Sequence, residues 1–257
     1  MKETDSIPCK ILVVVPCYNE AERLPEKTIL KAAASFPDLH FLFVDDGSSD
    51  ATETVMQRMS DQMPDRIQSM RLEKNSGKAE AVRKGMLKGM ESADYDYLGF
   101  LDADLSSPPE EIIHLKNYSS FRGGNHVFMF GSRIKLLGSD IVRNQSRHYF
   151  GRIAATAASV TLALPVYDTQ CGVKLFRREV CLKLFEKPFL SRWLFDVEIF
   201  FRLKELYERT EFGDKILEVP LRVWKETPGT KLKLSDVLKV PLELWKIHRE
   251  YNRFSRF

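Results

Sequence analysis

Two aspartates that follow an apolar run have the type and spacing of a cation site. The run from Tyr97 to Leu101 is largely apolar, and Asp102-Ala103-Asp104 comes directly after it. Residues two apart on an extended chain lie on the same side, so both carboxylates can face one ion. Mg²⁺ and Mn²⁺ prefer oxygen ligands, and substrate phosphates and water complete their coordination. The pair predicts a metal-bound diphosphate; the alternative is that one aspartate caps the helix that Pro108-Pro109 introduces.

Polar segments also follow two other apolar runs. Pro16-Cys17-Tyr18-Asn19-Glu20 comes after Ile11 to Val15, and Asp45-Asp46-Gly47-Ser48 comes after Phe41 to Val44. The second segment has two interpretations: a carboxylate accepts a hydrogen bond from a nucleotide's base or ribose, or Asp and Gly form a turn and Ser or Asp caps the next helix.

The segment Asn75-Ser76-Gly77-Lys78 has two interpretations. It is either an anion site made of backbone N–H groups and a lysine, or a plain turn at the start of a helix. It is not a Walker motif, because the first glycine and the Lys-Ser/Thr pair are missing.

Alternating strands and helices must position these residues. Short runs rich in β-branched or aromatic residues predict strands, and apolar residues three or four apart predict helices between them. The strands are Ile11 to Val15, Phe41 to Val44, Ser69 to Leu72 and Tyr97 to Leu101; the helices are Glu22 to Phe36, Ala51 to Met63 and Ala79 to Glu91. This order predicts an α/β fold with a mostly parallel sheet flanked by helices. The polar segments then meet at the carboxyl ends of the strands, where ligands bind in such sheets.

The second half of the chain is less regular. It contains a strand-like segment from Val127 to Phe130, a helix from Asp196 to about Arg209, and a helical tail from Leu232 that Pro241 interrupts or kinks. No linker or internal repeat divides the sequence, so residues 1–257 are expected to form a single domain.

Composition excludes several classes of protein. Hydrophobic residues make up 44% and charged residues 29%, which is typical of a folded globular chain. A net charge of +3 with interspersed signs does not indicate a nucleic-acid partner. No G-x-G-x-x-G follows the first strand, so a dinucleotide oxidoreductase is not expected. The four cysteines have no metal-ligand spacing and the N-terminus lacks a secretory signal, which favours the cytoplasm.

The apolar run from Ile153 to Val166 is about 14 residues long and is interrupted by hydroxyl side chains, so it is too short to cross a membrane. Basic residues precede it: Arg143, Arg147, His148 and Arg152. The run is either a buried core helix or a helix that lies on a membrane rich in anionic headgroups.

The order and spacing of these segments resemble family 2 glycosyltransferases of the GT-A fold, and especially the dolichyl-phosphate and polyprenyl-phosphate glycosyltransferases. Segments shared widely among glycosyltransferases are VVVPCYNEAERL (13–24), FVDDGSSDAT (43–52), KNSGKAEAVRKGM (74–86) and LDADLSSPPEEI (101–112). Segments similar to the dolichyl-phosphate glucosyltransferase branch are GSR (131–133), DTQCGVKLFRR (168–178), RWLFDVEI (192–199) and VWKETPGTKL (223–232).

The resemblance implies that about residues 8–125 bind the nucleotide sugar and about residues 126–257 bind the acceptor. The implied donor-binding residues are Pro16, Tyr18, Glu20, Asp45, Asp46, Lys78, Asp102, Ala103 and Asp104, with Asp102 and Asp104 holding Mg²⁺ or Mn²⁺. The implied acceptor and phosphate residues are Arg133, Arg147, Asp168 and Lys231, and Arg143 or Arg152 could replace Arg147. Where related mannosyltransferases place a metal-contacting Gln, this chain has Ser106.

Catalysis is expected to involve Asp104 and Asp196. Asp196 lies where other members of the superfamily keep a general base, and its alternative role is a helix N-cap. A sugar hydroxyl needs such a base, whereas a phosphate monoester is already anionic at neutral pH. The resemblance implies an inverting transfer of a hexose, glucose from UDP-glucose, to a polyprenyl or dolichyl phosphate.

Two alternatives stay open at this point. The same donor could serve a carbohydrate hydroxyl acceptor, or the chain could be a non-catalytic nucleotide-sugar-binding protein. Eukaryotic members of the family carry an N-terminal membrane anchor and some bacterial relatives carry C-terminal spanning helices. This sequence shows neither, so we expect either peripheral contact with the cytoplasmic face of a membrane or a soluble acceptor.

Overall fold

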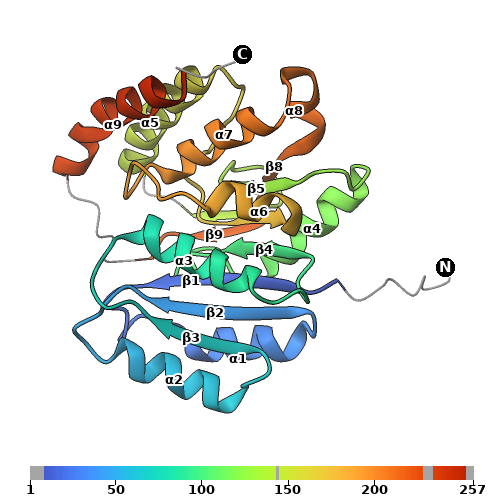
Figure 1. The fold of residues 1–257 in the computed structure, drawn as a ribbon, viewed down its shortest axis with the longest axis vertical. Coiled ribbons are helices and arrows are strands. Elements are labelled where there is room, and N and C mark those ends of the chain that lie inside the picture. The colour runs from blue at the N-terminus through green and yellow to red at the C-terminus, as the bar shows by residue number, and fades with distance from the viewer. Residues whose placement is uncertain (1–8, 143–144, 228–233, 253–257) are drawn as a thin grey trace.

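The computed structural model describes residues 9–142, 145–227 and 234–252. A seven-stranded sheet forms the centre of this fold. Its strands are β1 (Ile11–Cys17), β2 (Leu39–Asp45), β3 (Ile67–Arg71), β4 (Tyr97–Phe100), β5 (Phe128–Ser132), β7 (Lys174–Arg177) and β8 (Ile216–Pro220). They lie in the order β3-β2-β1-β4-β7-β5-β8 (Figure 1). Two short strands, β6 (Asp140–Val142) and β9 (Val223–Lys225), form a separate parallel pair.

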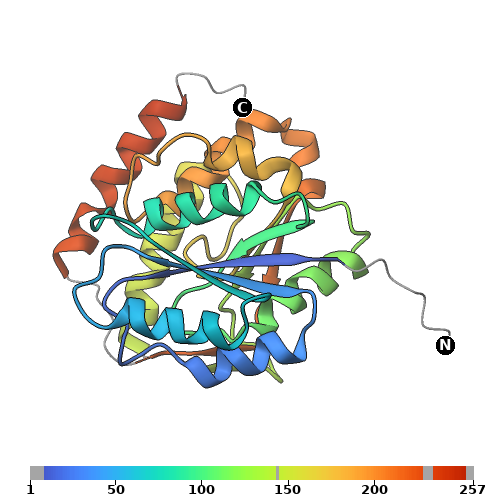
Figure 2. The same ribbon diagram turned by 60° about the horizontal axis from the view of Figure 1, so that its bottom comes forward.

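Helices cover both faces of this sheet. They are α1 (Glu26–Ser35), α2 (Thr52–Gln62), α3 (Lys78–Met90), α4 (Glu110–Phe121), α5 (Gln145–Leu162), α6 (Arg178–Phe185), α7 (Phe195–Leu206), α8 (Arg209–Lys215) and α9 (Leu234–Asn252). Side chains alternate between the faces along β1, so Ile11, Val13 and Val15 pack with α1, α2 and α4. Leu12 and Val14 pack instead into the core that contains α3, α6 and α7. Figure 2 shows α1 and α2 on one side of the sheet and α3 on the other.

The pairing of the strands fixes where their ends lie. β1 pairs in parallel with both β2 and β4, and β2 pairs in parallel with β3. The carboxyl ends of these strands therefore meet at one edge, where Cys17 stands opposite Asp45. The predicted mostly parallel α/β sheet is confirmed. The sequence did not reveal β7, which runs antiparallel between β4 and β5.

Several helix boundaries differ from the prediction. α1 begins at Glu26, four residues later than expected, because Pro25 occupies its N-cap position. α4 begins after Pro109 without a side-chain cap, so neither Asp102 nor Asp104 caps it. α9 continues through Pro241, which therefore does not interrupt it.

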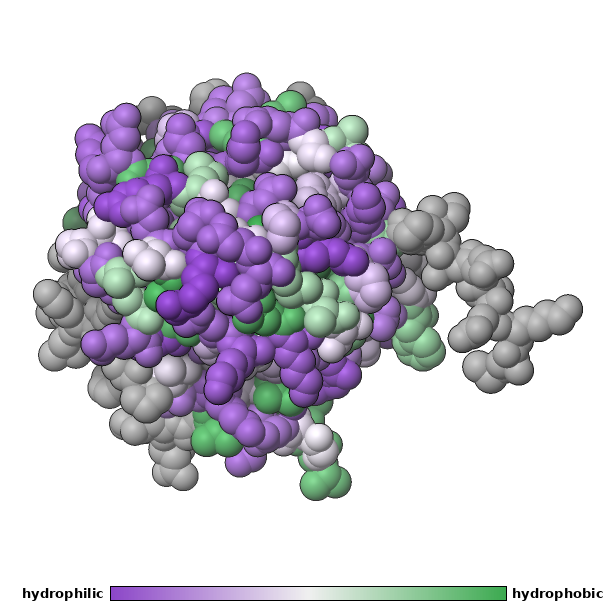
Figure 3. Space-filling view, turned by 90° about the horizontal axis from the view of Figure 1, so that it is seen from below, coloured by the Kyte–Doolittle hydropathy of each residue, from purple (hydrophilic) through white to green (hydrophobic). Residues whose placement is uncertain are grey.

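Helix α5 contains most of the apolar run whose role was open. Ala158 and Leu162 on this helix are buried, whereas Val160 is 73% exposed. One face of α5 therefore packs into the core and the other faces solvent. None of the helices in the described residues has the length and apolar content needed to cross a membrane. Hydrophilic side chains cover most of the face seen from below the β3 edge (Figure 3).

Candidate active site

The loops that follow β1 and β2 are joined by side-chain hydrogen bonds. The backbone N–H of Asn19 donates to Ser48 Oγ at 2.9 Å, and that of Glu20 donates to Thr52 Oγ1 at 2.8 Å. Pro16 and Glu20 are partly buried, and Tyr18 is 38% exposed. The expected nucleoside-pocket residues after β1 thus lie beside the end of β2.

Asp45, at the end of β2, is fully buried. Its Oδ1 accepts hydrogen bonds from the backbone N–H and the hydroxyl of Ser48, and its Oδ2 lies 3.4 Å from the Arg71 guanidinium. The Asp50 carboxylate accepts the N–H of Thr52, the first residue of α2, at 3.0 Å, while the N-cap position belongs to Ala51 and has no side-chain cap. Asp45 therefore shapes the turn, as one of the two interpretations predicted, but neither an Asp nor the Ser of Asp45-Asp46-Gly47-Ser48 caps α2.

Asp46 is also buried, and it fixes the start of α3. Its two oxygens accept the N–H groups of Ser76 and Gly77, each at 2.7 Å. Burial raises the pKa of Asp46 above its ordinary value, although these two hydrogen bonds oppose the shift. Gly77 has a φ of 97° and lies against Arg192, so a larger residue would be strained there. Because its N–H groups are bound to Asp46, the segment before α3 is a capped turn.

Lys78 and Asp102 form an ion pair at the carboxyl edge. Lys78 is the first residue of α3, and its Nζ lies 2.5 Å from Asp102 Oδ1. The side chains are 28% and 40% exposed respectively, so solvent reaches the pair.

The charges around this pair set its protonation. The pKa of Lys78 is raised above its ordinary value. Burial acts to lower it, but the nearby carboxylates of Asp102, Asp196 and Asp104 outweigh the effect of burial. The pKa of Asp102 is lowered below its ordinary value. Burial acts to raise it, but the nearby cations of Lys78, Lys174 and Arg133 outweigh the effect of burial. Asp102 is thus held ionised in a cationic environment.

The residues after β4 suit a hard cation only in part. Ala103 is buried, and Asp104 Oδ1 accepts the N–H of Ser106 at 3.0 Å. Within the described residues, no group of three His, Cys, Asp or Glu side chains is placed to hold a metal. A divalent ion bound by Asp102 and Asp104 would therefore take its other ligands from substrate phosphate and water, as Mg²⁺ commonly does. The partly exposed side chain of Asp102 fits this use, although its Oδ1 is buried and lies against the Lys78 ammonium.

The loop before β7 lies directly against Asp102. A Cβ atom added to Gly172 would fall 2.5 Å from Asp102 Cγ and 2.8 Å from Oδ1. No side chain fits between the loop and this carboxylate, so Gly172 allows the close approach.

Arg133 and Asp168 form a second ion pair near this edge. Arg133 Nε and Nη2 donate to the two oxygens of Asp168 at 2.6 and 2.7 Å, and the guanidinium lies 5.5 Å from the Trp224 ring centre. Burial lowers the pKa of Arg133, but Asp168 above all outweighs burial and raises it. Lys231 and the side chain of Arg147, which falls on α5, lie outside the described residues, so their predicted roles remain predictions.

A buried lysine that the sequence reasoning missed binds Asp196. Lys174 is fully buried, and its Nζ lies 2.6 Å from Asp196 Oδ1. It also donates to the carbonyls of Thr169 and Cys171 at 3.0 and 2.6 Å. Burial raises the pKa of Asp196, which Lys174 opposes. A charged residue inside the apolar run Val173 to Phe176 was the available signal.

Asp196 does not cap α7. The N-cap position belongs to Leu194, and Asp196 lies in the first turn of the helix. The Ser191 hydroxyl accepts the N–H groups of Trp193 and Leu194 before this helix. The buried carboxylate of Asp196 therefore faces Lys174, and the helix-cap alternative is wrong.

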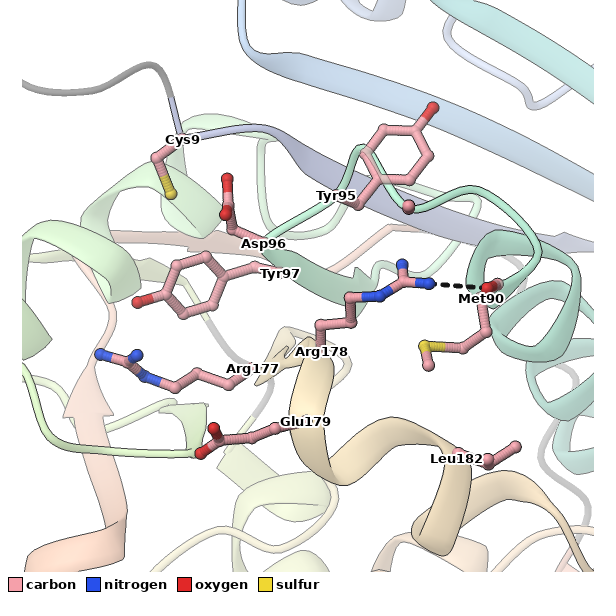
Figure 4. A pocket seen from close by; sticks show the side chains of 10 residues that line it. Cys9, Met90, Tyr95, Asp96, Tyr97, Arg177, Arg178, Glu179 and Leu182 are labelled. Atoms are coloured by element: carbon pink, nitrogen blue, oxygen red, sulfur yellow. Dashed lines mark hydrogen bonds between the residues drawn. The ribbon is translucent and has the colours of Figure 1, made fainter.

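A cavity of about 650 Å³ lies elsewhere, at the edge where β1 and β4 begin. Figure 4 shows Cys9, Tyr97, Arg177 and Arg178 around it. None of the predicted site residues that the structure describes lines this cavity. Asp45, Lys78 and Asp102 lie instead at the opposite, carboxyl edge of the sheet.

Comparison with known proteins identifies the family to which this chain is similar. Residues 12–185 match the family model described as Glycosyl transferase family 2. A dolichyl-phosphate beta-glucosyltransferase of Dictyostelium discoideum is 31% identical over 256 residues, which cover 93% of this chain and 74% of that protein. Polyprenol monophosphomannose synthase of Mycolicibacterium smegmatis is 28% identical over 250 residues, with coverage of 95% and 89%.

A solved structure shares the fold. Glucosyl-3-phosphoglycerate synthase from Mycobacterium tuberculosis, in complex with Mn²⁺, UDP and phosphoglyceric acid, superposes with a TM-score of 0.65 at 16% identity. The match covers 93% of this chain and 78% of that chain. The arrangement of sheet and helices is therefore one that holds Mn²⁺ and UDP in that protein.

Proposed function

Because the chain belongs to glycosyl transferase family 2 and has the GT-A fold, we propose that it transfers a hexose with inversion from a nucleotide diphosphate sugar to a polyprenyl or dolichyl phosphate. UDP-glucose is the proposed donor and glucose the transferred sugar, since the relative from Dictyostelium is named as a beta-glucosyltransferase. One observation carries the proposal: the accessible Asp102 carboxylate lies at the carboxyl edge, within a cluster of cations.

The donor half of the site has groups suited to each part of a nucleotide sugar. Tyr18 and the loops held together by Ser48 would contact the nucleoside. Asp102 and Asp104 would hold Mg²⁺ or Mn²⁺, which when bound neutralises charge on the leaving diphosphate. Lys78 carries a further positive charge to the same place. Together these groups favour departure of the nucleotide diphosphate.

The acceptor half offers cations more readily than a base. Arg133 is held in a fixed orientation by Asp168, and its planar guanidinium suits phosphate oxygens. Asp196 is buried and bound to Lys174, so it is poorly placed to take a proton from a substrate hydroxyl. An acceptor phosphate needs no such base, because it is already anionic. These contacts support a phosphate acceptor over a carbohydrate hydroxyl.

Contact with a lipid acceptor is proposed to be peripheral, on the cytoplasmic face of a membrane. The outer face of α5 exposes Val160, and Arg152 on the same helix donates to the Tyr167 carbonyl at 2.8 Å. Such a helix can lie at the boundary between headgroups and acyl chains.

Transfer of radiolabelled glucose from UDP-glucose to dolichyl phosphate tests the proposal, with GDP-mannose as the competing donor. We expect a labelled lipid that requires Mn²⁺ or Mg²⁺ and disappears with EDTA. Asp104→Ala should reduce transfer by roughly 100-fold or more, the scale expected when one group that stabilises the leaving charge is removed. Asp94→Ala, on the exposed loop before β4, is the matched control. Full activity in EDTA would refute the metal site, and absence of both transfer and donor hydrolysis would favour a non-catalytic binding protein.

A further inference from the structure

The two lysines beside the carboxyl edge differ in how firmly they are held. Lys174 is fully buried, and its ammonium is satisfied by Asp196 and by the carbonyls of Thr169 and Cys171. An ammonium has three N–H donors, so Lys174 has none left for another partner. Lys78 is 28% exposed and is paired with an accessible carboxylate of Asp102. Of the two lysines, only Lys78 can exchange its partner.

The backbone of Lys78 is fixed, while its side chain can move. Asp46 binds the two N–H groups just before it, and Arg192 Nε donates to the carbonyl of Ser76 at 3.0 Å. The lysine stem has four flexible carbons, and its ammonium binds phosphate as a point charge. The Nζ of Lys78 can therefore swing between Asp102 and a nearby phosphate without disturbing α3.

The position of the ammonium conflicts with a metal ion on Asp102. Lys78 Nζ lies 2.5 Å from Asp102 Oδ1, and a magnesium ion would need an oxygen at about 2.0–2.1 Å. Two cations so close on one carboxylate would repel each other strongly. A nucleotide diphosphate would relieve this repulsion, because it offers Lys78 an alternative anion beside the ion.

We propose that Lys78 is the counter-ion of Asp102 in the donor-free protein and that it must release Asp102 before a divalent cation binds. The diphosphate then receives Lys78, so metal and nucleotide bind cooperatively. This inference rests on the proposed function, since it presupposes a nucleotide diphosphate at this edge. It adds a reason for the metal to stay weakly bound until the donor arrives.

Titration of Mn²⁺, followed by the electron paramagnetic resonance signal of the free ion, tests the inference without turnover. In the wild-type protein UDP should raise the affinity for Mn²⁺ by about tenfold or more, within the usual range of coupling between sites. Lys78→Met should bind Mn²⁺ without UDP about tenfold more tightly than wild type, and UDP should then raise the affinity by a smaller factor than in wild type, because the diphosphate still supplies metal ligands but no longer has to draw Lys78 away. Lys78→Arg keeps the charge and should behave like wild type.

Lys84→Met is the matched control, because Lys84 is an exposed lysine on the same helix. An unchanged Mn²⁺ affinity in folded Lys78→Met, with coupling intact in wild type, would overturn this inference and leave the proposed function standing. If wild type binds neither Mn²⁺ nor UDP, both fail. Calorimetry on wild type needs no variant: Mn²⁺ must raise the affinity for UDP by the same factor, and a factor of one overturns cooperativity.

Discussion

Gly172→Ala should displace the Asp102 carboxylate without replacing any charged residue. The added methyl group would fall 2.5 Å from Asp102 Cγ, whereas an ordinary carbon–carbon contact is about 3.5–4.0 Å. The carboxyl group must therefore move by about 1 Å. The φ of Gly172 is not in the left-handed region, so alanine brings no backbone strain of its own.

The size of the effect follows from this displacement. A misplacement of about 1 Å in a reacting group can reduce the rate by roughly 100-fold, or about 2.7 kcal/mol of activation free energy. Overpacking costs roughly 1–3 kcal/mol of folding stability, which lowers Tm by about 2–12 °C for a chain of this size. Activity should thus be lost at temperatures where the protein remains folded.

The assay is kcat/KM for glucose transfer, together with Mn²⁺-dependent binding of UDP and a thermal melt. Gly213→Ala is the matched control, because an added Cβ there meets nothing within 4 Å. Wild-type kcat/KM and UDP affinity in a folded Gly172→Ala protein would refute the requirement for Asp102 in its observed position.

Four further outcomes are expected. Lys174→Met should lower the free energy of unfolding by about 3–5 kcal/mol, because it leaves Asp196 buried without its cation. Lys183→Met, on the exposed face of α6, should change the free energy of unfolding by less than about 0.5 kcal/mol; thermal melts of both variants measure the difference. Asp196→Asn should reduce kcat by less than about tenfold if the acceptor is a phosphate. A loss in kcat of roughly 10²- to 10⁴-fold with intact UDP binding would identify Asp196 as the base that deprotonates an acceptor hydroxyl. Burial raises the pKa of Cys171 to about 12, so its thiol stays protonated at pH 8 and should resist DTNB until urea unfolds the protein; equal labelling rates in buffer and urea would contradict this. Vesicles with anionic lipid should bind the protein in low salt and release it in high salt, and Val160→Asp should weaken this binding; salt-insensitive or absent binding would favour a soluble acceptor.

The first half of the fold was predictable because its signals are local. Strand β1 is a continuous apolar run, and Asp102 follows another such run, so the sequence identifies both the sheet and its polar edge. The antiparallel strand β7 was not predictable in this way. Its first residue is a buried lysine, and its partners are β4 and β5, which are far away in sequence.

The partners of the site residues were harder to predict than the residues themselves. The motifs indicated Asp46 and Asp196, but each carries the ordinary signature of a helix cap. Asp46 instead binds the turn before α3, and Asp196 binds Lys174 across the core. Such pairs depend on the packing of distant segments, which periodicity does not encode. Residue type was therefore a good guide to location and a poor guide to role.

The pairing of Arg133 gives Asp168 a role that the sequence left open. The Asp168 carboxylate accepts from Nε and Nη2 of the guanidinium and from the backbone N–H of Arg133 at 3.1 Å, and the Asp168 backbone N–H donates to Glu218 at 2.8 Å, so both the carboxylate and its backbone are held in place. Two of the five N–H donors of Arg133 are thereby used, and Nη1 remains on the opposite edge of the plane. An acceptor phosphate would meet this second edge in a fixed orientation. Asp168 would thus position Arg133 for phosphate without touching the substrate, which suits an acceptor that must present one oxygen to the anomeric carbon.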